Sequence, residues 1–306
     1  MDPLERMEKF YLANMRVVEE REMPYNPRST DVVVIGPPKS GTTWLQQILH
    51  QIRTKGDENF EDIYQVTWWI PFKYMKYDMD LNGEQVANPR IYKSHDRFNN
   101  VPKCDGMKFI IITRDPYDCQ WSFIKFFMRF HGAEEDLDED IALDLFRLGS
   151  EFGNDYFTIL TSWYEHRDDP NVMWLHYEDL KQDLRFCIEK ISEFLQIPLT
   201  EEELSRVYNF CTFDYMSKND MRFAGDIMLQ SVAKAIDAKK WDTNCAMVRK
   251  DGGQIGEGRK RIGPKLKQAV SERWAETVDK ELGFRDYEAL LKETSFLKKH
   301  GRQASK

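Results

Sequence analysis

This sequence lacks the features that mark disulfide-rich, metal-binding or membrane-spanning chains. Its 306 residues contain five cysteines and no Cys-x-x-Cys pair, which argues against a disulfide framework and against a zinc site. The longest apolar runs, such as residues 109–112, are far too short to cross a bilayer, and the first residues lack the layout of a signal peptide. We therefore expect a cytoplasmic protein that binds no metal and no membrane.

Positive charge is also scarce. The 44 lysines and arginines are outnumbered by 52 aspartates and glutamates, which gives a formal net charge of −8. Proteins that bind nucleic acid need a basic face, so this class is excluded and any anion must be bound by a local site. With 41% hydrophobic residues the chain can bury one large core. We expect a single domain over residues 1–306, with residues 1–30 as a lead-in and residues 286–306 as a partly mobile tail.

Buried strands alternate with helical stretches along the chain. Residues 31–35 (DVVVI) form a β-branched run that a turn separates from a helical pattern over residues 42–54. Three further segments have the character of strands, and helical stretches follow two of them: residues 90–93 (RIYK), 108–113 (KFIIIT) and 171–176 (NVMWLH). Repeated strand–loop–helix units favour parallel pairing. The fold class is therefore α/β, with a central parallel β-sheet flanked by helices.

The turn after the first strand has the glycine spacing of a phosphate-binding loop. It reads GPPKSGTT from Gly36 to Thr43, between a buried strand and the start of a helix. Backbone amides and hydroxyls at such a helix start hold phosphate oxygens. A nucleotide P-loop carries lysine directly after its second glycine, whereas here Lys39 precedes Gly41. The alternative is a proline-rich turn with a helix cap, but strand context, lysine, glycine spacing and hydroxyls coincide here, which favours phosphate binding.

The stretch PPKSGTTW resembles the 5′-phosphosulfate loop of the cytosolic sulfotransferase family. The resemblance implies transfer of a sulfuryl group from 3′-phosphoadenosine-5′-phosphosulfate (PAPS) to a hydroxyl or amine of a small acceptor, with 3′,5′-ADP as the product and no metal. It also implies a 5′-phosphosulfate site formed by Lys39, Ser40, Gly41, Thr42 and Thr43. Trp44 would stack on the adenine or, on the other interpretation, fill the core.

Further motifs resemble the parts of the family that bind the rest of the nucleotide. Arg114, followed eight residues later by Ser122, resembles the 3′-phosphate motif, although Arg114 could instead pair with Asp118. A basic loop near the C-terminus matches less well, because Asp251 stands where the family has glycine. By this resemblance the remaining nucleotide contacts would come from Tyr177, Thr212, Phe213, Arg249, Lys250 and Gly252.

The segment YKSHD resembles the family motif that supplies the catalytic base. Histidine is well suited to accept a proton near neutral pH, so His95 is the expected general base. The other interpretation is a turn histidine bonded to Asp96. Lys39 would stabilise the leaving phosphate, while Lys93 and Ser122 would position the sulfuryl group.

Two other functions remain open from the sequence: an ATP-dependent P-loop kinase and a nucleotide-binding scaffold without activity. A kinase would require a lysine after Gly41 and a magnesium carboxylate.

The acidic run over residues 134–140 (EEDLDED) indicates either a solvated surface or a site that attracts a cationic or polar acceptor. Aromatic residues in the stretch 68–72 and at 126–127 would line the acceptor pocket or fill the core. The family's dimer signature is not reproduced over residues 263–276, so the oligomeric state stays open.

Overall fold

The computed structural model describes residues 25–70, 80–130, 139–151, 155–225 and 253–302, without the side chains of residues 127–130 and 148–151. At its centre lies a five-stranded sheet in the order β2-β3-β1-β4-β5, and every strand pair is parallel. The strands are β1 (Val32–Ile35), β2 (Trp68–Trp69), β3 (Ile91–Ser94), β4 (Lys108–Thr113) and β5 (Val172–His176). The predicted parallel α/β sheet is confirmed.

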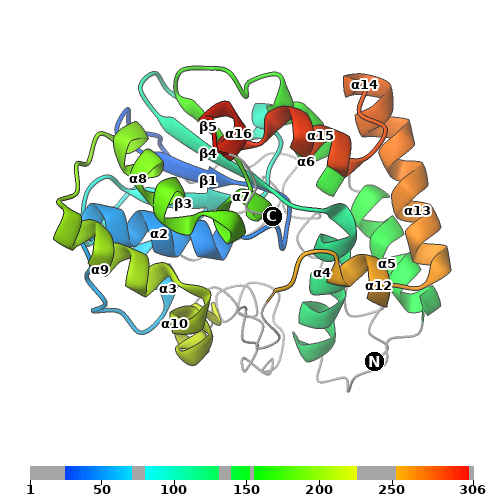
Figure 1. Ribbon diagram of the computed structural model, residues 1–306, viewed down its shortest axis with the longest axis horizontal. Coiled ribbons are helices and arrows are strands. Elements are labelled where there is room, and N and C mark those ends of the chain that lie inside the picture. Colours follow the sequence, from blue (N-terminus) through cyan, green and yellow to red (C-terminus); the bar gives the residue numbers. More distant parts are fainter. Residues whose placement is uncertain (1–24, 71–79, 131–138, 152–154, 226–252, 303–306) are drawn as a thin grey trace.

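The helices fill the connections between and after the strands. They are α2 (Thr42–Thr54), α3 (Ile63–Val66), η1 (Phe98–Asn100), α4 (Pro116–Phe130), α5 (Glu139–Glu151), α6 (Tyr156–Tyr164), α7 (Tyr177–Gln182), α8 (Leu184–Leu195), α9 (Glu201–Cys211), α10 (Phe213–Lys218), η2 (Asp220–Phe223), α12 (Glu257–Arg261), α13 (Pro264–Trp274), the π-helical η3 (Ala275–Asp279), α14 (Lys280–Leu282), α15 (Tyr287–Thr294) and α16 (Phe296–Lys299). In Figure 1, α2, α8 and α9 lie together beside the sheet, and α4, α5, α12 and α13 form a second group.

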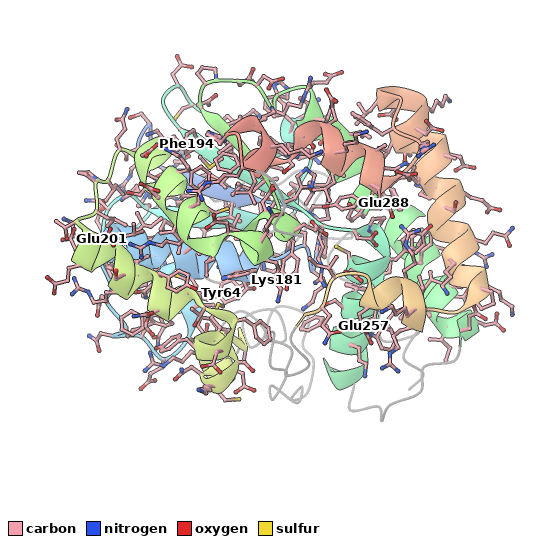
Figure 2. All side chains as sticks on the ribbon, viewed as in Figure 1. Tyr64, Lys181, Phe194, Glu201, Glu257 and Glu288 are labelled. Atoms are coloured by element: carbon pink, nitrogen blue, oxygen red, sulfur yellow. The ribbon has the colours of Figure 1, made fainter. Side chains whose placement is uncertain are left out.

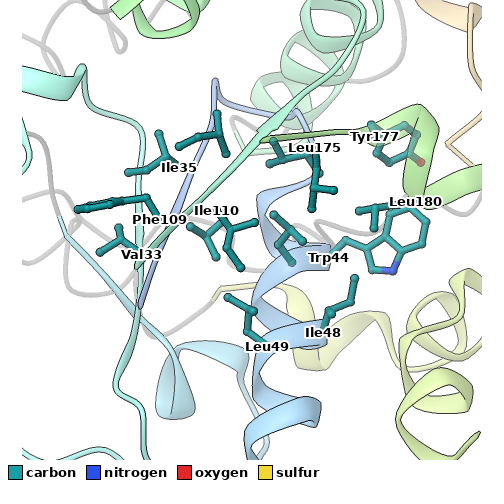
Figure 3. Close-up of a cluster of buried hydrophobic side chains, with 14 of the residues drawn as sticks. Val33, Ile35, Trp44, Ile48, Leu49, Phe109, Ile110, Leu175, Tyr177 and Leu180 are labelled. Carbon is teal, nitrogen blue, oxygen red and sulfur yellow. The ribbon is translucent and has the colours of Figure 1, made fainter. Parts of the chain in front are cut away.

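The hydrophobic core lies between the central strands and α2. Val33, Val34 and Ile35 of β1 are fully buried, as are Ile48 and Leu49 of α2. Figure 3 shows Val33, Ile35, Ile48 and Leu49 in one cluster, with Trp44 and Tyr177 at the end nearest the start of α2. A strand buried on both faces must be apolar throughout, which is why its sequence is a continuous β-branched run.

Two features differ from the sequence-based expectation. Trp68 and Trp69 form the edge strand β2, because Trp69 pairs with Lys93 in the register of the sheet. The sequence predicts a partly mobile tail over residues 286–306, whereas the structure places α15 and α16 there. Leu290, Phe296 and Leu297 are buried, and both helices pack against β5. The strand β5 is far from these helices in the sequence, so the local sequence does not reveal this packing. The single-domain division stays a prediction.

Within the described ranges, no helix is both long and apolar enough to span a bilayer. Four of the five cysteines fall in these ranges and all four are free thiols.

Candidate active site

The predicted site residues gather at the carboxyl ends of the parallel strands. The chain runs from β1 into the phosphate loop, from β3 to His95, from β4 to Arg114 and from β5 to Tyr177. After β1 the chain continues to β2 and β3 on one side of the sheet, whereas after β4 it continues to β5 on the other, so the connections diverge between β1 and β4. Open parallel sheets bind ligands at such a switch point. The topology therefore brings together four segments that lie far apart in the sequence.

The loop after β1 is a tight turn ahead of α2. The Ser40 amide and hydroxyl both donate to the Pro37 carbonyl, at 3.2 and 2.7 Å. Lys39 has a φ of 70° and Gly41, the N-cap of α2, a φ of 110°. A left-handed backbone at lysine is strained, and such strain persists where the surrounding structure holds a functional loop in place. The Lys39 ammonium lies 4.4 Å from the ring centroid of Phe126 on α4.

His95 is tied to the backbone of this loop. Its Nδ1 lies 2.6 Å from the Gly36 carbonyl oxygen. Since a carbonyl can only accept, Nδ1 carries the proton and Nε2 of the neutral ring carries the lone pair. Burial, with Lys93 and Lys39 nearby, holds the pKa of His95 well below its usual 6.5. The imidazole is therefore kept neutral with its lone pair on Nε2, and the alternative of a turn histidine bonded to Asp96 is not the arrangement seen at Nδ1.

Lys93 is a buried ammonium group next to His95. It is 5% exposed, and its Nζ donates to the Tyr64 hydroxyl at 2.9 Å. Burial, reinforced by Lys39, lowers the pKa of Lys93 from 10.5 to about 7. Figure 2 labels Tyr64, which belongs to α3, and Glu257, which belongs to α12. The two residues lie on opposite sides of the centre of that view. Nothing in the local sequence around Tyr64 indicated this contact, because it depends on the pairing of β2 with β3.

Arg114 lies over the ring of Tyr177, 4.2 Å from guanidinium carbon to ring centroid. Its Nη2 contacts Asp118 Oδ2 at 3.4 Å and the Gln254 carbonyl at 3.5 Å. Its Nε is buried and has no hydrogen-bond partner among the described residues. A buried guanidinium with an unused donor is suited to a phosphate, so this position fits the 3′-phosphate. The pairing with Asp118 proposed as an alternative is also present.

Ser122 is buried on α4, on the same helix face as Phe126 because the two are four residues apart. Phe126 touches Lys39, so this face of α4 is turned toward the phosphate loop. Ser122 therefore lies on the face of α4 that is turned toward the loop, and its role in positioning the sulfuryl group stays a prediction.

An aromatic group continues the site beyond Arg114. Trp44 and Tyr177 meet edge to face at 5.5 Å, and the Trp44 indole donates to the Cys211 carbonyl at 2.7 Å. The next residue, Thr212, caps α10 by accepting from the Tyr215 amide at 3.2 Å. Phe213 lies near Gly253, where an added Cβ would be 3.9 Å from its ring. Four residues predicted to contact the nucleotide thus cluster, and Trp44 itself is 8% exposed.

Three predicted residues, Arg249, Lys250 and Gly252, lie outside the described residues. Of the acidic run, only Glu139 and Asp140 are described. Glu139 accepts from the backbone amides of Lys265 and Leu266, and Asp140 pairs with the Lys265 ammonium at 2.6 Å. These two carboxylates therefore hold the start of α13. In the described ranges, no group of three or more histidine, cysteine or acidic side chains is arranged to hold a metal ion.

Comparison with known proteins agrees with this geometry. Residues 29–280 match the family model described as the sulfotransferase domain, and the chain belongs to this sulfotransferase family. Amine sulfotransferase of Oryctolagus cuniculus is 34% identical over 209 residues, covering 67% of this chain and 68% of its own length. Sulfotransferase 2A1 of Homo sapiens is 30% identical over 204 residues, covering 63% and 69%.

Solved structures share the fold. Mouse sulfotransferase SULT7A1, complexed with PAP, superposes with a TM-score of 0.61 at 22% identity, covering 89% of this chain and 92% of that one. Retinol dehydratase in a complex with retinol and PAP gives a TM-score of 0.63 at 21% identity, covering 85% and 83%. Family membership supports PAPS-dependent sulfuryl transfer as the reaction of this enzyme and does not favour the kinase alternative.

Proposed function

We propose that this enzyme transfers the sulfuryl group of PAPS to an uncharged amine or hydroxyl of a small acceptor, with His95 as the general base. The observation that carries this proposal is the Nδ1 contact between His95 and the Gly36 carbonyl. It directs the basic Nε2 away from the loop backbone and fixes the base relative to the turn that would bind the donor.

The donor would be held by the two cationic ends of the site. Lys39, with Ser40, Gly41, Thr42 and Thr43, would bind the 5′-phosphosulfate. Arg114 and Ser122, with Arg249, Lys250 and Gly252, would bind the 3′-phosphate. The aromatic group of Trp44, Tyr177 and Phe213, with Thr212 beside it, would bind the adenosine. The unused Arg114 Nε supports the second assignment.

When bound, the donor supplies the sulfuryl group and a phosphate that leaves with the electrons of the broken S–O bond. His95 Nε2 takes the proton of the acceptor as the new O–S or N–S bond forms. Lys39 stabilises the negative charge that develops on the leaving phosphate. Lys93 places a second positive charge beside the transferring group, in a buried setting where Coulomb interactions are strong.

The acceptor class follows from the charges around the base. The positive charges of Lys39 and Lys93 both lower the pKa of His95. The same charges would repel a cationic acceptor beside His95. An amine would therefore react in its neutral form. The relationship to an amine sulfotransferase supports amines as first candidates. The prediction of a cationic or polar acceptor thus narrows to molecules that present a neutral amine or hydroxyl group to the base.

Turnover with labelled PAPS tests the proposal. Primary and secondary amines, phenols and alcohols should be compared as acceptors, with the sulfated product and 3′,5′-ADP measured together. We expect equimolar amounts of both products. Phosphoryl transfer from ATP with an absolute magnesium requirement, and no turnover of PAPS with any acceptor, would contradict it.

A further inference from the structure

A carboxylate of α4 binds a segment that lies 138 residues further along the chain. Asp118, 1% exposed, accepts from the Gly256 amide at 2.9 Å and from the Gly258 amide at 2.6 Å. These amides lie at the start of α12, whose own N-cap residue provides no side-chain hydrogen bond. Asp118 therefore satisfies donors that the short helix leaves open.

Shape and charge fix the same contact. A Cβ on Gly258 would lie 2.2 Å from the Tyr117 carbonyl oxygen, so only glycine lets α12 approach the first turn of α4 this closely. Arg259 adds an ion pair with Asp115 at 3.2 Å and lies over the Tyr117 ring at 4.3 Å. Residues 254–259 are thus held against the beginning of α4 by several independent contacts.

Arg114 contacts both α4 and the segment that is docked on it. Its Nη2 meets the same Asp118 Oδ2 that accepts from Gly256, and it also meets the Gln254 carbonyl. One carboxylate oxygen therefore joins the guanidinium to the docked segment. A carboxylate beside an anion site opposes the anion by Coulomb repulsion, so its presence here needs a compensating role.

We propose that Asp118 is a positioning residue for 3′-phosphate recognition: it docks residues 254–258 on α4 and through this contact sets the orientation of Arg114. The inference rests on the proposed function, in which Arg114 binds the 3′-phosphate. Asp118 itself does not touch the nucleotide. Its contribution is the pre-organisation of a guanidinium whose bonds to phosphate depend on direction.

The experiment measures selectivity for the 3′-phosphate. Calorimetry on the full chain gives the dissociation constants of adenosine 3′,5′-bisphosphate and of AMP, which lacks that phosphate. Asp118→Asn removes the charge that docks the segment, and Gly258→Ala displaces the segment while Asp118 stays intact. We expect each variant to lose about tenfold or more of the selectivity, with AMP affinity unchanged, because a charged hydrogen bond contributes on that scale.

Two control variants match these changes. Asp183 likewise caps a helix, accepting from the Phe186 amide, and pairs with Arg302 at 3.3 Å. Gly83→Ala introduces a Cβ whose nearest neighbours lie 3.5 Å away. Asp183→Asn and Gly83→Ala should keep the wild-type selectivity. In an Arg114→Ala background, Asp118→Asn should change the ratio no further, since the two residues act through one interaction.

The outcomes separate this inference from the proposed function. If the wild-type enzyme fails to prefer the bisphosphate over AMP, the assignment of Arg114 to the 3′-phosphate fails. If the wild type discriminates and Asp118→Asn keeps or increases the selectivity, the positioning role is wrong and the carboxylate only opposes the anion. Should Asp118→Asn not fold, Gly258→Ala decides the matter alone.

Discussion

Replacing Lys93 with methionine should stabilise the enzyme while abolishing turnover. The folded pKa of Lys93 is about 7 against an ordinary value of 10.5, so unfolding takes up a proton between these values. The stability that the folded protein loses by burying a charged Lys93 is absent above pH 10.5, and this loss grows as the pH falls toward 7. It reaches about 4 kcal/mol at pH 7 and about 2 kcal/mol at pH 9.

Methionine has a similar length and no charge, so it removes this penalty but also the hydrogen bond to Tyr64. That bond contributes about 1 kcal/mol, which leaves a net gain of about 3 kcal/mol at pH 7. With an unfolding entropy of about 2.1 cal/mol/K per residue, the melting temperature should rise by about 5 °C. Turnover should be lost, because the variant lacks the buried charge beside the transferring group.

Thermal unfolding of wild type and Lys93→Met at pH 7 and pH 9, in the absence of nucleotide, tests the reasoning. At pH 9 the net gain falls to about 1 kcal/mol, so the difference in melting temperature should shrink to about one third of its value at pH 7. Lys218, on α10, has a side chain 72% exposed, so Lys218→Met serves as the control and should change stability little at either pH. Two results would refute a destabilising buried charge at Lys93. One is a folded Lys93→Met protein that melts at or below the wild-type temperature, and the other is a difference in melting temperature that does not depend on pH.

Other variants and conditions test the remaining roles. His95→Ala should abolish turnover and leave the calorimetric affinity for adenosine 3′,5′-bisphosphate unchanged; retained turnover would exclude the base assignment. Because the pKa of His95 lies well below 6.5, kcat/KM should not fall as the pH is lowered through 6.5, and a loss of kcat/KM on the acid side with a midpoint near 6.5 would contradict this. Lys39→Ala should lower kcat and weaken donor binding together, measured by initial rates and calorimetry, and an effect on KM alone would argue against leaving-group stabilisation. Arg114→Ala should narrow the affinity gap between the bisphosphate and AMP by at least about tenfold, since charged hydrogen bonds to the 3′-phosphate are lost.

The sequence by itself determined the fold class and the local elements of the site. Residues 108–113 are a strand in the structure as predicted, and α2 covers residues 42–54 as predicted. These elements are readable because periodicity, glycine spacing and helix starts are properties of neighbouring residues. The same holds for Lys39, His95 and Arg114, each of which lies within four residues of the end of a predicted strand.

Only the tertiary structure decided what those residues touch. The bond from His95 to Gly36 arises because β3 pairs with β1 in a register that aligns Ser94 with Ile35. The low pKa of Lys93 depends on its burial and on Lys39, and its hydrogen bond goes to Tyr64 of the separate helix α3. The docking of Gly258 on Asp118 joins residues 140 positions apart. Desolvation and long-range hydrogen bonds are set by which surfaces meet, and a linear pattern does not contain that information.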